Sequence, residues 1–264
     1  MRYKMALSYD GAPFFGWQRQ SDAPSVQQCL EEALSTLLRE RVDVTGAGRT
    51  DTGVNASAYT AHFDASNPLD TTQICYKLNA ILPPAVKVHS IERTADDFHA
   101  RFDATEREYT YFLHRVKDPF IAGRSYLCGY PVLDFEAMNR AAHALLGTHD
   151  FACFAKTGSD VKTTVCTLRE ACWYSYEPDH VRLGGYPAGV DGAGQEGYYY
   201  FRIRGDRFLR NMVRAIVGTL IEVGRGKRSA GSMAALLESG DRCSAGESVP
   251  GHALFLSHVG YPEE

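Results

Sequence analysis

Strand-like and helix-like segments follow one another in an irregular order, and this order restricts the possible folds more than any other feature of the sequence. Alternation of apolar and polar residues at the start of the chain predicts a half-buried strand with one side made of Tyr3, Met5, Leu7 and Tyr9. Further strands are predicted over residues 86–93, 109–115 and 198–204, and helices over 71–82 and 135–146. Because a helix does not follow each strand, as it does in repeated βαβ units, the pattern predicts an α+β fold.

The start of another helix is marked by a capping box. Ser25 is followed three residues later by Gln28, which is the spacing of this motif. The helix that begins there has an apolar stripe made of Val26, Leu30, Ala33, Leu34 and Leu37. Residues 177–197, in contrast, are rich in glycine and proline and have little periodicity, so we expect an exposed insertion loop there.

The strongest helical pattern covers residues 207–223 and has an apolar side and a basic side. The apolar side is formed by Leu209, Met212, Val213, Ile216, Val217 and Leu220, and the opposite side by Arg207, Arg210, Asn211 and Arg214. Between residues 202 and 228 the chain has eight basic and two acidic residues, a local charge of +6, although its net charge is −4. A solvated helix face is the simpler interpretation. The excess of arginine over lysine favours a phosphate-binding surface, because arginine binds phosphates bidentately and stacks on bases.

A glycine-rich loop carries the leading candidate for chemistry. Residues 46–53 read GAGRTDTG, and an alternating strand pattern resumes after them at Asn55. Asp51 is therefore expected on a tight loop between two strands, with Arg49 and two threonine hydroxyls nearby. Positive charge and donated hydrogen bonds both favour an ionised carboxylate. The alternative is an aspartate that only hydrogen-bonds its own turn.

Other classes of protein fit the sequence poorly. Asp51-Thr52-Gly53 matches the aspartic-protease signature, but a single-chain protease needs a second such aspartate, and there is none. The nine histidines have no paired ligand spacing, which predicts no metal site, and the sequence has no P-loop, GxGxxG or GxSxG pattern. The net acidic charge excludes a histone-like protein.

The cellular compartment is also constrained by composition. The seven cysteines are odd in number and form no CxxC pair, which predicts reduced, mostly buried thiols. The N-terminus has no apolar core of signal-peptide length, and no stretch approaches about 18 apolar residues. We therefore expect a cytoplasmic protein without a membrane partner.

Several segments resemble one enzyme family. Residues 46–56, GAGRTDTGVNA, are similar to the catalytic loop GxGRTDAGVHA of the tRNA pseudouridine synthase A family, and residues 9–20, YDGAPFFGWQRQ, resemble its opening YDGTxFxGWQxQ. Further resemblances occur in order at residues 78–83, 98–102, 107–111, 147–151, 208–218 and 254–261, so they cover essentially the whole chain. Thr52 stands where the family has Ala, Asn55 where it has His, and Ala253 where it has Gly.

This resemblance implies a fold and an activity. The fold is the pseudouridine-synthase α+β fold, with two ferredoxin-like halves, residues 1–105 and 106–264, joined around a central basic cleft. The activity is the isomerisation of uridine to pseudouridine at positions 38, 39 and 40 in the anticodon stem-loop of tRNA, without a cofactor or a metal. Family members are homodimers, so a homodimer that binds tRNA is expected. The alternative is a tRNA-binding protein that has kept the fold and lost catalysis.

The resemblance also implies a role for each site residue. Asp51 is the nucleophile, with attack at C6 of the base or at C1′ of the ribose left open. Tyr109 packs on the flipped uracil and brings a hydroxyl close to the reacting atoms, Arg214 pairs with Asp51, and Leu254 closes the pocket against water. The residues expected to bind tRNA are Arg49, Arg207 and Arg210. Without the resemblance, the simpler interpretation of Tyr109 is a core residue, and that of Arg214 is another phosphate contact on the basic face.

Overall fold

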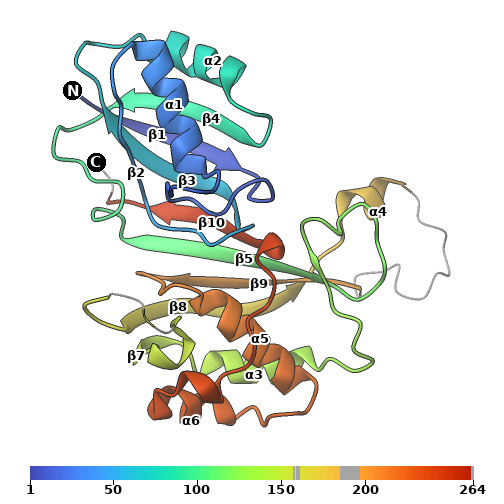
Figure 1. The fold of residues 1–264 in the computed structure, drawn as a ribbon. Helices are drawn as coiled ribbons and strands as arrows, with labels where there is room; N and C mark the ends of the chain where they lie inside the picture. The colour runs from blue at the N-terminus through green and yellow to red at the C-terminus, as the bar shows by residue number, and fades with distance from the viewer. Residues whose placement is uncertain (157, 159–160, 185–196, 263–264) are drawn as a thin grey trace. The chain divides into compact units, whose positions relative to one another are not determined.

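The computed structural model describes residues 1–156, 158, 161–184 and 197–262 (Figure 1). The chain divides into two compact units, one formed by Met1–Arg107 with Phe255–Glu264 and the other by Glu108–Leu254. The predicted halves, 1–105 and 106–264, differ from these units chiefly in residues 255–264, which belong with the N-terminal residues. The assignment of functional halves stays a prediction.

The sheet of the first unit has the strand order β4-β1-β3-β10, and β2 also pairs with β3. These strands are β1 (Arg2–Tyr9), β2 (Val44–Gly46), β3 (Asn55–Asp64), β4 (Val86–Arg93) and β10 (Leu254–Gly260). β1 is antiparallel to both of its neighbours. β2 pairs with residues 61–63 of β3, whereas β10 runs parallel to β3 at Asn55 and Ala56. The strand that follows the predicted aspartate loop is therefore paired at both of its ends.

Two helices, α1 (Val26–Leu38) and α2 (Thr71–Ile81), lie side by side against one face of this sheet (Figure 1). The Ser25 hydroxyl accepts a hydrogen bond from the backbone N–H of Gln28 at 3.2 Å, which confirms the predicted helix start. α1 buries Val26, Leu30 and Leu34, and β1 buries all four residues of its predicted apolar side. Sequence periodicity therefore identified both partners of this core.

The second unit contains the strand order β5-β9-β8-β7, and β6 pairs with β5 in parallel. These strands are β5 (Glu106–His114), β6 (Tyr126–Leu127), β7 (Gly147–Asp150), β8 (Val165–Ser175) and β9 (Tyr198–Gly205). The helices are α3 (Phe135–His143), α4 (Asp179–Gly184), α5 (Met212–Gly224) and α6 (Ser232–Ser239). α5 is buried on nearly every side, as expected of a helix at the centre of a core. The predicted mixture of helices and strands is confirmed.

Two predicted elements need correction. The helix predicted over residues 207–223 begins only at Met212, because Asn211 has a left-handed φ of 67° that interrupts helical geometry. The insertion expected to be a loop contains the short helix α4, which buries Val181, and residues 185–196 of that prediction lie outside the described residues. Neither the left-handed Asn211 nor the short helix α4 leaves a periodic pattern in the sequence.

The cysteines and the helices bear on the predicted compartment. All seven cysteines are free thiols, but only Cys128, Cys153 and Cys166 are buried, so the expectation of mostly buried thiols is wrong. Burial raises the pKa of each of these three thiols. Within the described ranges, no helix is long and apolar enough to cross a membrane.

Candidate active site

The Asp51 loop, residues 47–54, connects β2 to β3 and ends in a tight turn. The backbone N–H of Val54 donates to the carbonyl of Asp51 at 3.1 Å, and Gly53 has a φ of 74°. Glycine adopts this left-handed conformation without steric cost. Asp51 is half-buried, whereas Thr50 and Val54 on either side are buried. The turn therefore leaves Asp51 accessible while its neighbours anchor it.

Three aromatic side chains support the Asp51 loop. Trp17 and Tyr59 are stacked with ring centroids 4.2 Å apart, and Tyr9 meets Tyr59 edge-on at 5.5 Å. The Tyr9 hydroxyl lies 2.9 Å from the hydroxyl of Thr50, and the Tyr59 hydroxyl donates to the carbonyl of Gly48. All three rings are buried. The sequence placed these aromatics in strands and in family segments, but it gave no sign that they meet at one loop.

A second turn, residues 11–20, packs directly against the Asp51 loop, and we call it the Phe15 turn. The N–H of Trp17 donates to the carbonyl of Thr50 at 3.2 Å, and the N–H of Gly53 donates to the carbonyl of Phe14 at 3.4 Å. Gly16 has a φ of 97°, and a Cβ at this position would lie 2.5 Å from the carbonyl oxygen of Thr50. The two turns can approach this closely only because residue 16 has no side chain.

Asn55 and Arg107 hold the two ends of the Asp51 loop. The Asn55 side-chain oxygen accepts the N–H of Gly11 at 2.8 Å, so the residue that departs from the family's histidine fixes the Phe15 turn. Arg107 donates to the carbonyl of Ala47 at 3.1 Å. It also donates to the carbonyls of Arg101 and Ala104. Neither role can be predicted from the sequence, because the partners are far away along the chain and are backbone groups that carry no sequence signal.

Tyr109 lies on β5 in the second unit and is half-buried. Its ring meets Phe208 edge-on, with centroids 5.1 Å apart. Tyr111, two residues later on the same side of the strand, is completely buried. The alternative role considered for Tyr109, that of a core residue, therefore fits Tyr111 better.

Arg214 lies near the start of α5 and is clamped to the segment before β10. Its Nε donates to the carbonyl of Val249 at 2.7 Å, and its own carbonyl accepts the N–H of Val249 at 3.2 Å. A Cβ at Gly218 would lie 1.8 Å from the carbonyl oxygen of Glu247, so the segment touches the helix backbone. Both the side chain and the backbone of Arg214 are thus hydrogen-bonded to Val249, and these contacts orient its guanidinium group.

The basic face predicted for residues 207–214 does not exist as a helix face. Arg207, Arg210 and Asn211 precede α5, and Arg214 is the only one of the four on the helix. Hydrogen bonds to other segments hold residues 206–211, which lead into α5. Asp206 accepts the N–H of Thr167 at 2.8 Å, and the carbonyl of Arg210 accepts the N–H of Lys156 at 3.0 Å. Arg207 is half-buried and Arg210 is exposed.

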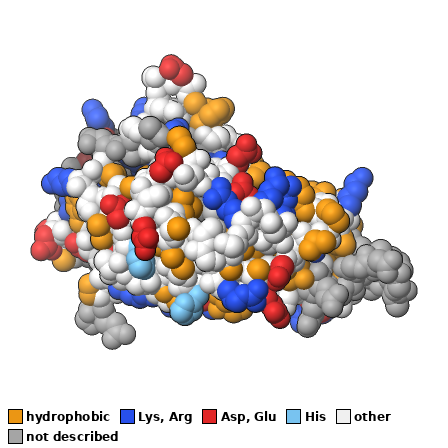
Figure 2. Space-filling model, turned by 90° about the horizontal axis from the view of Figure 1, so that it is seen from below, with side chains coloured by type: hydrophobic (Ala, Val, Ile, Leu, Met, Phe, Trp, Pro, Cys, Tyr) orange, Lys and Arg blue, Asp and Glu red, His pale blue; other side chains and the backbone are white. Residues whose placement is uncertain are grey.

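Part of the basic charge between residues 202 and 228 is neutralised by Glu170, which lies outside that segment. Glu170 accepts hydrogen bonds from Arg202 at 2.6 Å and from Arg204 at 3.1 Å. Burial opposes ionisation of Glu170, but hydrogen bonds from Arg202 and Tyr174 outweigh it and lower the pKa of the carboxyl. On the face in Figure 2, Lys and Arg are interspersed with Asp and Glu. The local charge of +6 therefore overstates the charge available to phosphates.

The predicted site residues are distributed over both units. Asp51 and the exposed Arg49 share one loop of the first unit. The second unit holds Tyr109, Arg207, Arg210, Arg214 and Leu254, and Leu254 is buried directly after the 3₁₀ turn Gly251–Ala253. The pairing of Asp51 with Arg214 stays a prediction.

Comparison with known proteins identifies the family. The family model described as tRNA pseudouridine synthase matches residues 5–103 and 141–262. A tRNA pseudouridine synthase A of Bacteroides thetaiotaomicron is 48% identical over 263 residues, which cover 100% of this chain and 91% of the relative. The chain belongs to the tRNA pseudouridine synthase family. The same name is carried by a protein of Parabacteroides distasonis, 47% identical with 100% and 97% coverage, and by one of Bacillus licheniformis, 39% identical with 99% coverage of both chains.

The match to the tRNA pseudouridine synthase family covers some site residues and not others. Its first segment contains the Asp51 loop and the Phe15 turn, and its second contains Arg214 and Leu254. Tyr109 falls between the two matched segments. The role of Tyr109 therefore depends on the local RxYxY resemblance and on its position beside Phe208.

Proposed function

We propose that this chain converts uridine to pseudouridine at positions 38, 39 and 40 in the anticodon stem-loop of tRNA, with Asp51 as the nucleophile. As a member of its family the protein is an isomerase that acts on uridine in tRNA. The single observation that carries the proposal is the Asp51 loop, which holds an accessible carboxylate between buried anchors. The three positions come from the resemblance to the family.

The chemistry requires a transient covalent bond to Asp51 and one rotation of the base. The Asp51 carboxylate attacks the nucleoside, at C6 of the base or at C1′ of the ribose, and the N1–C1′ bond breaks. The uracil turns while it is held in the pocket, a C5–C1′ bond forms, and the bond between Asp51 and the nucleoside breaks, which regenerates the carboxylate. The proton on C5 is then lost and N1 gains one, so that the product is an isomer of the substrate. A flipped base is needed because the glycosidic bond cannot be reached in the stack.

Three residues of the second unit complete the proposed site. Tyr109 supports the flipped uracil with its ring, and its hydroxyl takes part in moving the C5 proton. Arg214, whose guanidinium is oriented by Val249, pairs with Asp51 and keeps it ionised. Leu254 shields the pocket from water. Arg49, Arg207 and Arg210 bind tRNA phosphates.

We also propose the two-halved pseudouridine-synthase fold with a central basic cleft, in a cytoplasmic homodimer. The first unit supports the fold: its chain order β1-α1-β2-β3-α2-β4 is the βαββαβ order of a ferredoxin-like half. The dimer and the compartment follow the family resemblance.

The deciding experiment is conversion of an unmodified tRNA transcript, with pseudouridine located by carbodiimide treatment and primer extension. We expect modification at positions 38–40 with the unaltered protein and none with Asp51→Asn, because an amide of the same shape is not a competent nucleophile. Asp43→Asn, an exposed carboxylate before β2, is the matched control and should leave conversion unchanged. Binding without any product from the unaltered protein would instead indicate the catalytically inactive tRNA binder.

A further inference from the structure

Phe15 is an exposed aromatic residue at the edge of the Asp51 loop. Its side chain is 56% exposed, whereas Phe14 and Trp17 in the same turn are 6% and 3% exposed. A single exposed apolar residue is common and needs no explanation by itself. The position of Phe15 is informative, because the residues on both sides of it contact the Asp51 loop through the Phe14 carbonyl and through Gly16.

The backbone of Phe15 is fixed by hydrogen bonds on both of its polar groups. Its N–H donates to the carbonyl of Pro24 at 2.9 Å, and its carbonyl accepts a hydrogen bond from the side chain of Gln20 at 3.1 Å. The turn is closed by the N–H of Phe14, which donates to the carbonyl of Gly11 at 3.0 Å. The ring is therefore displayed from a rigid support at a defined place beside Asp51.

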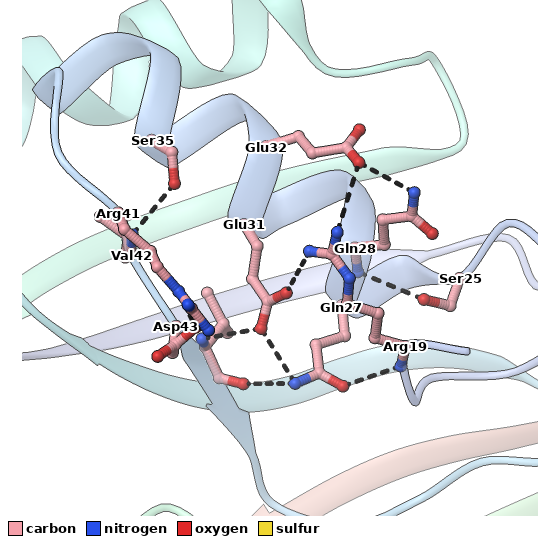
Figure 3. Close-up of polar contacts among 11 residues, drawn as sticks. Arg19, Ser25, Gln27, Gln28, Glu31, Glu32, Ser35, Arg41, Val42 and Asp43 are labelled. Carbon is pink, nitrogen blue, oxygen red and sulfur yellow. Dashed lines mark hydrogen bonds and ion pairs between the residues drawn. The ribbon is translucent and has the colours of Figure 1, made fainter. Parts of the chain in front are cut away.

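A buried carboxylate joins the Phe15 turn to the strand that leads into the Asp51 loop (Figure 3). Glu31 of α1 is only 6% exposed, and its two oxygens accept hydrogen bonds from Arg19 at 2.9 Å and from the N–H of Val44 at 3.1 Å. The backbone N–H of Arg19 also donates to Gln27 at 2.9 Å. Because the charge of Arg19 is matched by Glu31, this turn offers RNA an aromatic face rather than a phosphate-binding cation.

We propose that Phe15 stacks on the base next to the target uridine in the bound tRNA. When a uridine leaves the stack, its neighbour loses a stacking partner, and an aromatic side chain can replace that partner. A rigid ring beside the nucleophile can do this while Asp51 engages the flipped nucleotide. The inference rests on the proposed function and assigns Phe15 as a substrate-positioning residue for it.

The test uses an anticodon stem-loop with a single target uridine at position 39 and 2-aminopurine at position 38 or 40. Binding is measured with variants that also carry Asp51→Asn, so that no turnover occurs, and single-turnover conversion is measured without that change. Phe15→Ala and Phe15→Leu should each weaken binding roughly 5- to 150-fold, the range of one lost base–aromatic stack. At one of the two labelled positions, the 2-aminopurine should be brighter in these complexes than with unaltered Phe15. Phe15→Tyr should restore both properties.

Tyr76→Ala is the matched control, because Tyr76 is 77% exposed on α2 and has no part in either turn. It should change neither affinity nor fluorescence. The inference fails if Phe15→Ala binds and fluoresces like the unaltered protein, or if Phe15→Leu is as good as Phe15→Tyr, since apolar contact without stacking would then suffice. If the unaltered protein itself makes no pseudouridine, the proposed function fails. If the unaltered protein makes pseudouridine and the Phe15 variants bind and fluoresce as it does, this inference alone fails.

Discussion

Tyr109 and Tyr111 lie on the same side of β5, yet the two hydroxyls have different environments. Tyr111 is completely buried, and burial raises the pKa of its hydroxyl well above the usual range. Among the described residues, the Tyr111 hydroxyl has no hydrogen-bond partner. Tyr109 is half-buried against Phe208. Of the two tyrosines, only Tyr109 is partly exposed, which supports the proton transfer proposed for it.

This difference predicts that removing the Tyr109 hydroxyl slows the reaction and that removing the Tyr111 hydroxyl does not. Tyr109→Phe should bind tRNA almost normally but form pseudouridine roughly 10²- to 10⁴-fold more slowly, the usual range for a lost general acid or base. Tyr109→Ala should in addition weaken binding, because the ring is lost. The measurement is single-turnover conversion at saturating enzyme.

Tyr111→Phe is the internal control. It should convert tRNA at the unaltered rate and should not lower thermal stability, because a buried hydroxyl without a partner contributes little to the folded state. An unaltered rate in Tyr109→Phe would rule out proton transfer and leave Tyr109 as a stacking residue only.

At the scale of elements, residues 206–211 form the connection between β9 and α5, which we call the approach to α5, and it carries Arg207 and Arg210 outside the helix. The approach is held by the hydrogen bond that Asp206 accepts from Thr167 of β8 and by the hydrogen bond that the Arg210 carbonyl accepts from Lys156. Glu170 pairs with Arg202 and Arg204, so these arginines are less suited to bind phosphate. The phosphate contacts of this region are therefore expected from the approach rather than from β9.

Arg207→Ala and Arg210→Ala should each weaken tRNA binding and reduce the slope of log affinity against log salt by about 0.7–0.9, the effect of one lost phosphate contact. Arg140→Ala, which removes a surface arginine of α3 in the same unit, should leave the slope unchanged. Equal slopes for all three variants and the unaltered protein would show that the approach does not meet RNA.

The elements also show what a sequence can predict. β1 and α1 follow their periodicity, because each has one buried face. β8 was missed, because a bulge between Leu168 and Glu170 shifts its alternation, so that Leu168 and Ala171 are buried three residues apart. The predicted start of α5 was wrong, because the left-handed conformation of Asn211 does not disturb the periodic pattern of the sequence.

The sequence was sufficient to predict the candidate reactive residue, but not the contacts that hold the loop around it. Asp51 could be found from glycines at turn positions, since Gly53 needs its positive φ. The hydrogen-bond acceptors of Arg107 are backbone carbonyls, which any residue carries. The cluster of Tyr9, Trp17 and Tyr59 brings together three segments that are separate in sequence. Such contacts depend on the complete fold, so no local pattern reports them.

At the scale of the whole molecule, a buried histidine makes unfolding depend on pH. His62 of β3 is 5% exposed, and its Nδ1 accepts the N–H of Ala100 at 3.1 Å. Burial, together with repulsion from Arg2 and His99, lowers the pKa of His62 to about 4. Between pH 6.5 and 4 the unfolded chain therefore binds a proton that the folded chain does not.

The free energy of unfolding should thus fall as pH decreases from 6.5 to 4, by on the order of 3 kcal/mol from this residue. Urea unfolding at a series of pH values measures it. His62→Gln should flatten the dependence in this window, whereas His89→Gln, at an exposed position of β4, should not. An unchanged dependence in His62→Gln would contradict the assignment.

The pairing of β10 with β3 has a consequence for how the protein is made. The ribosome synthesises a chain from its N-terminus onward, so β10 emerges only after residues 108–253 have been made. Its partners on β3 are Asn55 and Ala56, which directly follow the Asp51 loop. A nascent chain can therefore bury most of its first core early, but the end of β3 beside the Asp51 loop lacks its β10 partner until the whole second unit has been synthesised.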